Sequence, residues 1–439
     1  MHKVGNKAFS AVLILSFMLG TLPPAAFSAS KPGDYGRFRT LDDENNNLDI
    51  GIPNLTRRVN KELPEIDRKQ GIKAGYLKLH PSFSTTYEFD DNVSLANSQR
   101  EKELQDSIFI QRPGIAAEAK VGNHRIEGGY GMEIHNFAKF TEENKINHLA
   151  YGLGEFNFND FRLLVEDNYE RSTSRLFSET SERDRLSINE AHVLGVYDRP
   201  RWATELGWTH NTVSHVTDTF KLNNYDEDIY ALLGGYKVLP KTLLLAEIDI
   251  GNVYYDKKVI AADQTYVQLL GGVRGKPTEA IDMTAKVGVQ NRQLADVPGE
   301  GRQTDYQGLV VDSDVTYRIT EADVVRMGYD RTVKTSTFNA NSWYREDKIY
   351  FSYRKRFLSK WYLTPTISWQ MNDYPEGSTI GSETLKRTDH FLQTGVGLRY
   401  KIREWAWAGI AYNFRGRDSN FNSFDYDNNR FIADLSLAY

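Results

Sequence analysis

From about Gly75 to Tyr439 the sequence repeats one unit, in which roughly ten residues alternate between apolar and polar types before a turn. The last unit ends the chain, and its alternate residues fall on one face of a strand: Phe431, Ala433, Leu435, Leu437 and Tyr439. Such strands are too many to hide their apolar faces in a soluble core, because no comparable set of helices accompanies them. A closed barrel with lipid outside and water inside satisfies every strand. The pattern therefore predicts an all-β fold, a transmembrane antiparallel up-and-down β-barrel of the bacterial outer membrane.

The same alternation predicts about eighteen strands. We place them at 76–89, 106–120, 124–137, 146–158, 161–172, 186–198, 202–214, 226–238, 242–255, 264–275, 281–293, 305–318, 322–334, 346–357, 361–372, 386–401, 405–417 and 428–439.

The connections between these strands alternate in length. Some are tight, such as Asn159-Asp160 and Leu358-Ser359-Lys360. The others are longer and rich in Asn, Asp, Ser, Glu and Gly, for example 173–185, 294–304, 335–345 and 373–385. Bacterial barrels have short periplasmic turns and long extracellular loops. We therefore expect both chain termini in the periplasm.

The N-terminal region has a different composition. A basic start precedes an apolar run from Ala8 to Leu22, and small residues follow up to Ser28, as in a secretory signal peptide. The run is short for a membrane anchor, which is the alternative. The predicted organisation is a signal peptide at 1–28, a periplasmic extension or plug at 29–74 and the barrel at 75–439. A contact for a periplasmic partner and a disordered tail are the other options for 29–74.

The composition argues against several other classes of protein and kinds of site. The mean hydropathy of −0.55 is that of a soluble protein, but in a barrel only every second strand residue meets lipid. The net charge of −5 is too small to indicate nucleic acid as a partner. The sequence contains no cysteine, which excludes a lipid-anchored cysteine, a disulfide and a thiolate metal site.

Charged residues predicted to face the lumen are the candidate site of this chain. Alternation assigns to the pore the basic residues Arg326, Arg354, Arg356, Arg399, Arg415 and Arg417. It assigns to the pore the acidic residues Glu205, Glu247, Asp249, Asp312 and Asp314. A basic wall opposite an acidic one would set a transverse field and hold an anionic polymer to one side. The alternative is that these charges pair across neighbouring strands and fill a wet lumen.

Two tryptophans near the last short turn have two possible positions. Trp405 and Trp407 share the parity of Asn413 and Arg415, so both could face the pore and guide a sugar polymer. Anchoring at the membrane interface is the other option, and we favour it slightly.

Signals for catalysis or metal binding are weak. The histidines are scattered over many predicted strands, and no nucleophile, base and orienting group recur at a useful spacing. The residues Asp43, Asn45, Asn47 and Asp49 alternate as in a calcium loop, but Leu48 occupies the position where such a loop requires glycine. We therefore expect no enzyme, no cofactor and no metal site.

Two features resemble a known family. One is the opening strand Leu79–Val93, with His80-Pro81-Ser82 near its start and Asp90-Asp91-Asn92 near its end, and the other is the run of Tyr-rich hairpins that leads to the terminal strand. Together they resemble the outer-membrane β-barrel porins encoded with exopolysaccharide and exosortase systems. The resemblance covers about residues 75–439. It implies a barrel linked to export of a surface polysaccharide, and it implies no catalytic residues.

The expected function is therefore a channel that assists export of a surface or extracellular polysaccharide. A general diffusion porin, a structural or adhesive barrel and a barrel hydrolase are the alternatives, in that order. Expected partners are outer-membrane lipid and lipopolysaccharide, the barrel-assembly machinery, the polysaccharide and periplasmic export components, and no nucleic acid. The outward residues of the last strand are expected to form the assembly signal: Phe431, Leu435, Leu437 and Tyr439.

Overall fold

The computed structural model describes residues 71–97, 104–175, 183–257, 262–297, 301–302, 304–336, 338, 341–380 and 383–439. The predictions for the signal peptide and for residues 29–70 lie outside the described residues. Among the described residues, no helix has the length and apolarity needed to cross a membrane.

Alternating sequence becomes strand throughout the described part of the chain. The strands are β1 (Ile72–Ala74), β2 (Leu77–Asp90), β3 (Asp106–Val121), β4 (His124–Phe137), β5 (Lys145–Phe158), β6 (Phe161–Arg175), β7 (Arg183–Asp198), β8 (Trp202–His215), β9 (Tyr225–Leu239), β10 (Thr242–Tyr255), β11 (Gln264–Thr278), β12 (Ile281–Leu294), β13 (Asp296–Val297), β14 (Gly301–Arg302), β15 (Tyr306–Arg318), β16 (Asp323–Thr335), β17 (Trp343–Phe357), β18 (Trp361–Ile380), β19 (Glu383–Arg403), β20 (Ala406–Ser419) and β21 (Tyr426–Ala438). In the ranges that the structure describes, three short 3-10 turns lie in connections: η2 (Thr141–Glu143), η3 (Asp218–Asn223) and η4 (Asn422–Phe424).

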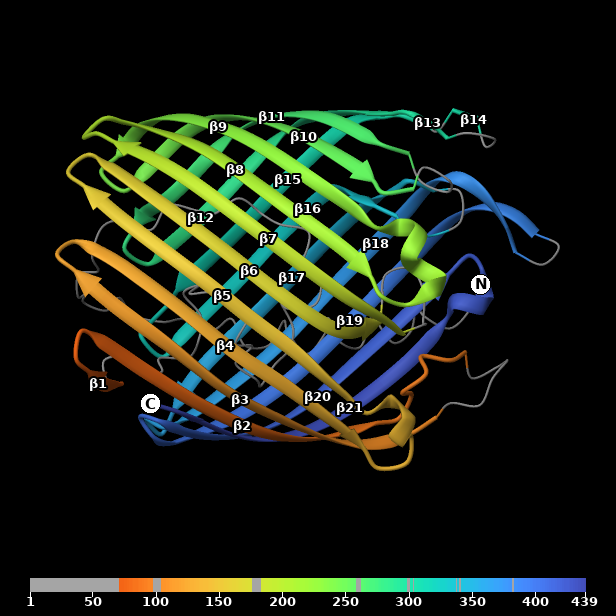
Figure 1. Ribbon diagram of the computed structural model, residues 1–439, viewed down its shortest axis with the longest axis horizontal. Coiled ribbons are helices and arrows are strands. Elements are labelled where there is room, and N and C mark those ends of the chain that lie inside the picture. Colours follow the sequence, from red (N-terminus) through yellow and green to blue (C-terminus); the bar gives the residue numbers. More distant parts are fainter. Residues whose placement is uncertain are drawn as a thin grey trace. The chain divides into compact units, whose positions relative to one another are not determined.

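The eighteen long strands form one closed antiparallel barrel (Figure 1). Each strand pairs with the next long strand along the chain, and β21 returns to pair with β2 from Ser82↔Ala438 to Asp90↔Arg430. Closure removes the sheet edges that an open sheet would leave unpaired. The predicted fold class and the number of strands are confirmed.

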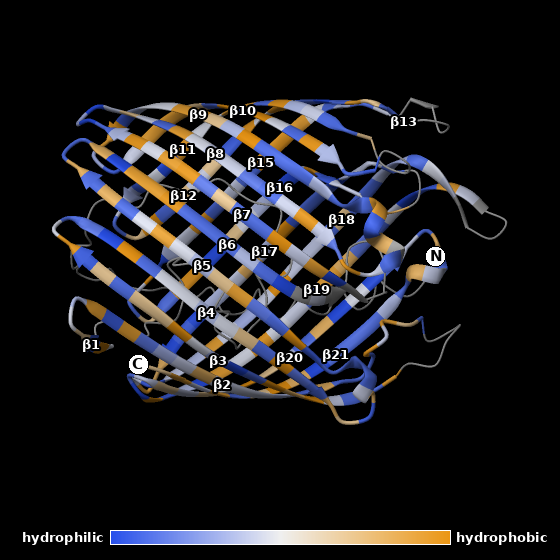
Figure 2. Cartoon of the chain, in the orientation of Figure 1, coloured by the Kyte–Doolittle hydropathy of each residue, from blue (hydrophilic) through white to orange (hydrophobic). Residues whose placement is uncertain are grey.

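Hydrophobic and hydrophilic residues alternate along the strands that face the viewer in Figure 2. On β2, for example, Phe83 and Tyr87 are exposed on the outside, whereas Ser84 and Thr86 between them are buried. Apolar side chains cover the outer face, as a barrel in lipid requires. The inner face carries polar and charged side chains together with an apolar cluster, formed by Ala203, Leu233, Leu243 and Leu245.

The rim that carries the tight turns, here called the short-turn rim, also holds the C-terminus and β1 (Figure 1). The first residues of β2 pair with β3, but β21 ends opposite Ser82 and leaves their other side without a neighbour. The chain turns back at Gly75, with φ of +64°, and pairs β1 with them from Ile72↔Leu79 to Ala74↔Leu77. This small strand, which was not predicted, covers the edge where the barrel closes.

The opposite rim, here called the long-loop rim, differs from the prediction in one place. Residues 373–385, predicted to be a loop, mostly continue the ladder, because β18 runs to Ile380 and β19 begins at Glu383. The register shifts between Asp373 and Gly377, around Pro375. Proline cannot donate a ladder hydrogen bond, so the sequence that suggests a turn forms a bulge in a longer hairpin.

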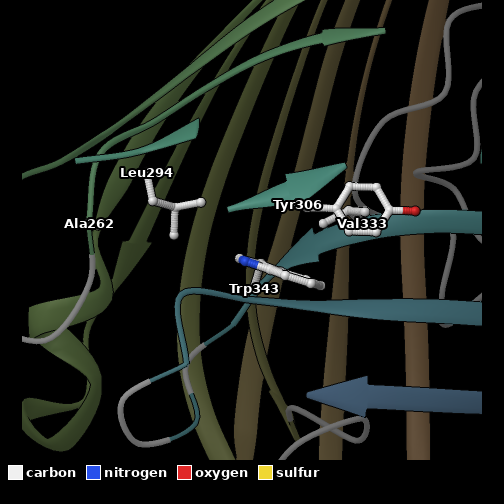
Figure 3. Close-up of a cluster of buried hydrophobic side chains, with 5 residues drawn as sticks. All are labelled: Ala262, Leu294, Tyr306, Val333 and Trp343. Atoms are coloured by element: carbon white, nitrogen blue, oxygen red, sulfur yellow. The ribbon is translucent and has the colours of Figure 1, made fainter. Parts of the chain in front are cut away.

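An apolar cluster at the long-loop rim packs the ends of four strands together (Figure 3). Ala262 follows β10 and lies with Leu294, Tyr306, Val333 and Trp343. The Tyr306 and Trp343 rings meet edge to face at 5.2 Å. Buried aromatic pairs of this kind hold the connections of this rim against the barrel wall.

Candidate functional site

The inner face can be followed around the whole barrel, because directly paired residues lie on the same face of a sheet. Glu118 on β3 pairs with Glu127 on β4, Glu127 pairs with Leu153, and Leu153 pairs with Glu166. The same register continues strand by strand and returns to β2. It assigns a face to each charged residue of the wall.

Acidic residues predominate on the inner face of β2–β10, which form one half of the barrel. They are Glu88, Asp90, Asp106, Glu118, Glu127, Glu133, Glu155, Glu166, Glu170, Glu190, Asp198, Glu205, Glu227, Glu247 and Asp249. The basic residues on the same half are fewer: Lys78, Arg112, Lys120, Arg125, Lys145, Arg162 and Lys237.

Basic residues predominate on the inner face of the other half, from β11 to β21. They are Arg274, Lys276, Lys286, Arg292, Arg318, Arg326, Lys334, Lys348, Arg354, Arg356, Arg387, Arg399, Lys401, Arg415, Arg417 and Arg430. The acidic residues of the regular ladder on this half are Asp282, Asp312, Asp314, Asp330, Glu346, Asp389 and Asp434. In a ring of eighteen strands β6 lies opposite β17, so an acidic wall faces a basic wall across the lumen.

The acidic candidate residues lie mainly where the two walls meet, and there they form ion pairs. Glu205 on β8 accepts hydrogen bonds from both terminal nitrogens of the Arg274 guanidinium. The Lys286 ammonium lies 3.2 Å from Glu247 and 3.1 Å from Asp312, and so bridges two carboxylates. Local pairing, the alternative weighed above, therefore operates along this boundary.

Two more acidic candidates have polar partners on neighbouring strands. Asp249 on β10 accepts a 3.1 Å hydrogen bond from the Gln268 side chain. Asp314 accepts a 2.7 Å hydrogen bond from Arg326 and another from the Tyr350 hydroxyl. Arg326, a basic candidate, is thus held against the wall by Asp314, a carboxylate on the same half of the barrel.

Carboxylates lie near two of the other basic candidates. Arg399 lies 3.4 Å from Asp434, and Arg356 lies 3.8 Å from Glu321 in a short turn. Arg354, two residues before Arg356 on β17, has no ion-pair or hydrogen-bond partner in the part of the chain that the structure describes. Arg415 pairs with Gln393 and Asn428 in the ladder and so shares their face. Along the basic wall the candidates therefore differ in how closely a carboxylate approaches them.

A cage of rings surrounds an arginine that sequence reasoning missed. Arg387 on β19 has its guanidinium carbon 4.3 Å from the Phe338 ring centroid, 5.0 Å from that of Tyr374 and 3.9 Å from that of Phe424. Its Nη2 also lies 2.6 Å from Asp389. Phe338 and Phe424 belong to two different connections of the long-loop rim, so this arginine cage draws both connections over the inner wall.

Arg417, the last basic candidate, lies beside this arginine cage. Its Nε donates to the Phe424 carbonyl, and its guanidinium lies 4.8 Å from the Tyr426 ring centroid. Asp425, in the neighbouring connection, accepts a 2.7 Å hydrogen bond from the Ser419 N–H. Burial raises the pKa of the Asp425 carboxyl above its ordinary value, although this hydrogen bond and Arg417 lower it. The position of Arg417 is therefore at the long-loop rim rather than in mid-channel.

A second polar layer missed from sequence crosses the boundary between the walls. Tyr266 donates a 3.1 Å hydrogen bond to Glu227, which also accepts one from Asn211. The Arg292 guanidinium stacks 4.5 Å from the centroid of the Tyr266 ring and donates to Gln264. These residues come from four strands, β8, β9, β11 and β12. The one signal in the sequence that could have indicated this layer is that alternation places all of them on the inner face.

The two tryptophans near the last short turn take different positions. Trp407 is buried on the inner face, where its ring lies 5.2 Å from that of Tyr362 and 5.6 Å from the Lys401 ammonium. Trp405 lies in the turn before β20 and is exposed. The slightly favoured interfacial position is therefore wrong for Trp407, which lies on the inner face. The pore position is wrong for Trp405, because the turn interrupts the alternation that relates the two residues.

The outward residues of the last strand lie on the lipid-facing side. Phe431, Leu435 and Tyr439 are exposed there, while Ser436 between them is buried on the inner face. The Tyr439 N–H donates a 3.0 Å hydrogen bond to the Pro81 carbonyl, so the chain end is fixed at the closing strand pair. Among the residues that the structure describes, no group of three or more acidic or histidine side chains could hold a metal ion.

A closed barrel of eighteen strands with an apolar outside and a charged inside defines an outer-membrane barrel of the porin class. The model of the family described as "Putative beta-barrel porin 2" matches residues 216–439, just over half of the chain. The chain belongs to this family, and it is an outer-membrane β-barrel porin. No curated protein matches the sequence.

Several solved outer-membrane proteins are similar in fold. OccAB3 of Acinetobacter baumannii is 12% identical, with 83% of this chain and 99% of that chain covered and a TM-score of 0.46. OpdK of Pseudomonas aeruginosa, solved with vanillate, is 11% identical, with 82% and 99% covered and a TM-score of 0.44. OccK2 (OpdF) of the same species, in complex with glucuronate, is 13% identical, with 84% and 100% covered and a TM-score of 0.45. No conclusion about solutes follows from likeness at this level.

Proposed function

We propose that this barrel is a passive diffusion channel for small hydrophilic solutes across the outer membrane. The observation that carries the proposal is the closed ring of eighteen strands with a charged inner face. Barrels of sixteen to eighteen strands are too wide for their side chains to fill and enclose an aqueous channel. The proposal also agrees with membership of a porin family.

Liposome swelling tests this function directly. Purified, folded barrel in liposomes should admit sugars and amino acids up to a size limit, and the swelling rate should fall steadily as the solute grows. Heat-denatured protein at the same lipid ratio is the control. Swelling no faster than in protein-free liposomes for every solute would contradict a diffusion channel.

The opposed charges of the inner walls suggest which solutes the channel prefers. A field between an acidic and a basic wall orients molecules that carry both charges, such as zwitterions. Replacing Arg354 and Arg356 by Glu should weaken this field and shift the reversal potential in a salt gradient toward cation selectivity. Lys386→Glu, on the outer face of β19, is the matched control and should leave the potential unchanged. Equal shifts in the two variants would show that the lumen charges do not set selectivity.

Export of an anionic polysaccharide is the second candidate, and the basic wall favours it. Arg354, Arg356 and Arg399 on the proposed pore lining could guide carboxylate or phosphate groups along the wall. A strain without this gene should then lose a surface polymer, and the three Arg→Glu replacements should not restore export. Normal amounts of every surface polymer in the deletion strain would leave solute diffusion as the function.

The proposed orientation puts the short-turn rim in the periplasm. An impermeant thiol reagent on intact cells should then label Asn422→Cys, in a connection of the long-loop rim, and should not label Ser359→Cys, in a short turn. The reverse pattern would invert the orientation. In the same arrangement the outward residues of β21 would meet the barrel-assembly machinery from the periplasmic side.

A further inference from the structure

The outer wall of the barrel has a shallow pocket of about 490 Å3 near the long-loop rim. It lies on β4–β7 and the connection between β4 and β5. Its lining residues are Ile134, His135, Asn136, Asn144, Lys145, Ile146, His148, Arg171 and Arg185. The register gives Ile134, Ile146, His148, Arg171 and Arg185 outward-facing positions. A pocket with two arginines on a lipid-facing wall is unusual, because charge there is expensive.

Three donors of this pocket lie close together. His148 on β5 is directly opposite Arg171 on β6, and Arg185 on β7 is opposite Thr173, one diagonal step from Arg171. Diagonal neighbours on one face of a sheet are about 7–8 Å apart, within reach of two long side chains. The Tyr130 hydroxyl lies 2.8 Å from His148 Nδ1 and holds the ring. When Tyr130 donates this bond, the neutral ring keeps its proton on Nε2 and offers it outward.

Within the described part of the chain, the two arginines have no counter-ion. Both side chains are exposed, and neither guanidinium has an ion pair or hydrogen bond in the described part of the chain. Arg345 on β17 is also outward-facing, but it lies 3.1 Å from both Asp347 and Asp373. On the outer wall, carboxylates therefore neutralise Arg345, whereas no described carboxylate neutralises Arg171 or Arg185.

The height of the pocket matches the headgroups of the membrane. Arg171 is ten residues beyond Phe161 at the short-turn rim, which for a tilted strand is roughly 25 Å, the height of the apolar band. In the next outward row toward the short-turn rim the wall exposes Tyr130 and Tyr169, which pair through Ala150. The surface thus changes from apolar to cationic where acyl chains end and lipid phosphates begin.

From this geometry we propose that Arg171, Arg185 and His148 bind a phosphate of lipopolysaccharide in the outer leaflet. The guanidiniums donate charge-assisted hydrogen bonds to phosphate oxygens. The acyl chains lie along Tyr130 and Tyr169 in the row below. The ligand class is a phosphorylated glycolipid with several acyl chains, and the site is independent of what passes through the lumen.

Native mass spectrometry of the intact, folded barrel measures this binding. Wild type mixed with lipid A and a tenfold excess of phosphatidylglycerol should retain one lipid A. The double variant Arg171→Gln, Arg185→Gln should retain at least about tenfold less, because it loses two charge-assisted hydrogen bonds. Lys386→Gln, an exposed outward lysine on β19, is the control and should retain lipid A as wild type does.

A change in the lipid tests the same contact without any change in the protein, so the test does not depend on how well the double variant folds. Lipid A without its phosphates should not be retained by wild type. Equal retention of lipid A with and without phosphate would overturn the proposal, as would equal retention by wild type and the folded double variant. Preference of wild type for phosphatidylglycerol over lipid A would also overturn it, since the phosphate would then belong to a simple phospholipid.

Discussion

Placing an arginine on the outer face of β20 tests the assignment of alternate strand residues to the lipid and to the lumen, on which the description of the inner walls depends. Ile410 is 60% exposed on that face and lies five residues beyond Trp405 in the short turn. For a tilted strand this is roughly 12 Å above the short-turn rim, near the middle of an apolar band about 25 Å tall. Arginine at the bilayer midplane of a barrel costs about 2–4 kcal/mol. Ile410→Arg should therefore lower the folding equilibrium constant roughly 30- to 900-fold.

The matched control is the next residue along the strand. Ala411 pairs with Gly397 and Ile432 and faces the lumen, so Ala411→Arg puts the same charge into water. Guanidinium unfolding in lipid vesicles, followed by tryptophan fluorescence, measures both variants. We expect a large loss of stability for Ile410→Arg and a small change for Ala411→Arg. Equal losses, or a greater loss for Ala411→Arg, would refute the assignment of the two faces.

Three further predictions use the same unfolding assay or the yield of folded barrel. Glu205→Gln should destabilise the barrel by on the order of 1–3 kcal/mol, because it removes the charge that Arg274 faces; an unchanged midpoint would exclude a structural role for this pair. Gly288→Ala should also destabilise, since a Cβ would lie 1.7 Å from the Leu269 carbonyl oxygen, whereas Gly234→Ala has open space and should be neutral. Leu435→Arg should reduce the amount of heat-modifiable barrel in cells, and normal assembly would argue against a signal on the outer face of β21.

The sequence predicted the ladder of strands well because two constraints act on every strand at once. A side-chain period of two leaves one choice of face, and each strand must cross the same apolar thickness. The strand predicted at 124–137 is β4, His124–Phe137, with the same ends. The hairpin of β18 and β19 was predicted too short, because Pro375 and Gly377 have turn chemistry. Pairing between residues on either side of the bulge overrides that local preference.

The interior was predicted less completely, because its contacts join residues far apart in sequence. Parity placed Glu205 in the lumen, but its partner Arg274 is 69 positions later and three strands away. Only the stagger of the strands brings these two side chains to one height. The arginine cage is a stronger case, since Phe338 and Phe424 come from irregular connections where alternation says nothing. The separation of acidic and basic walls, by contrast, can be predicted from the sequence, because the alternation of each strand assigns its charged residues to the inner or the outer face.

Single-channel recording in planar lipid bilayers tests most directly whether the barrel is open. We expect stepwise insertions whose conductance rises in proportion to potassium chloride concentration, as for a water-filled lumen of eighteen strands. The folded state of the sample should be verified by heat-modifiable migration before each recording. Folded protein that inserts into the bilayer and gives no conductance steps at any voltage would contradict the central claim that this porin is a diffusion channel.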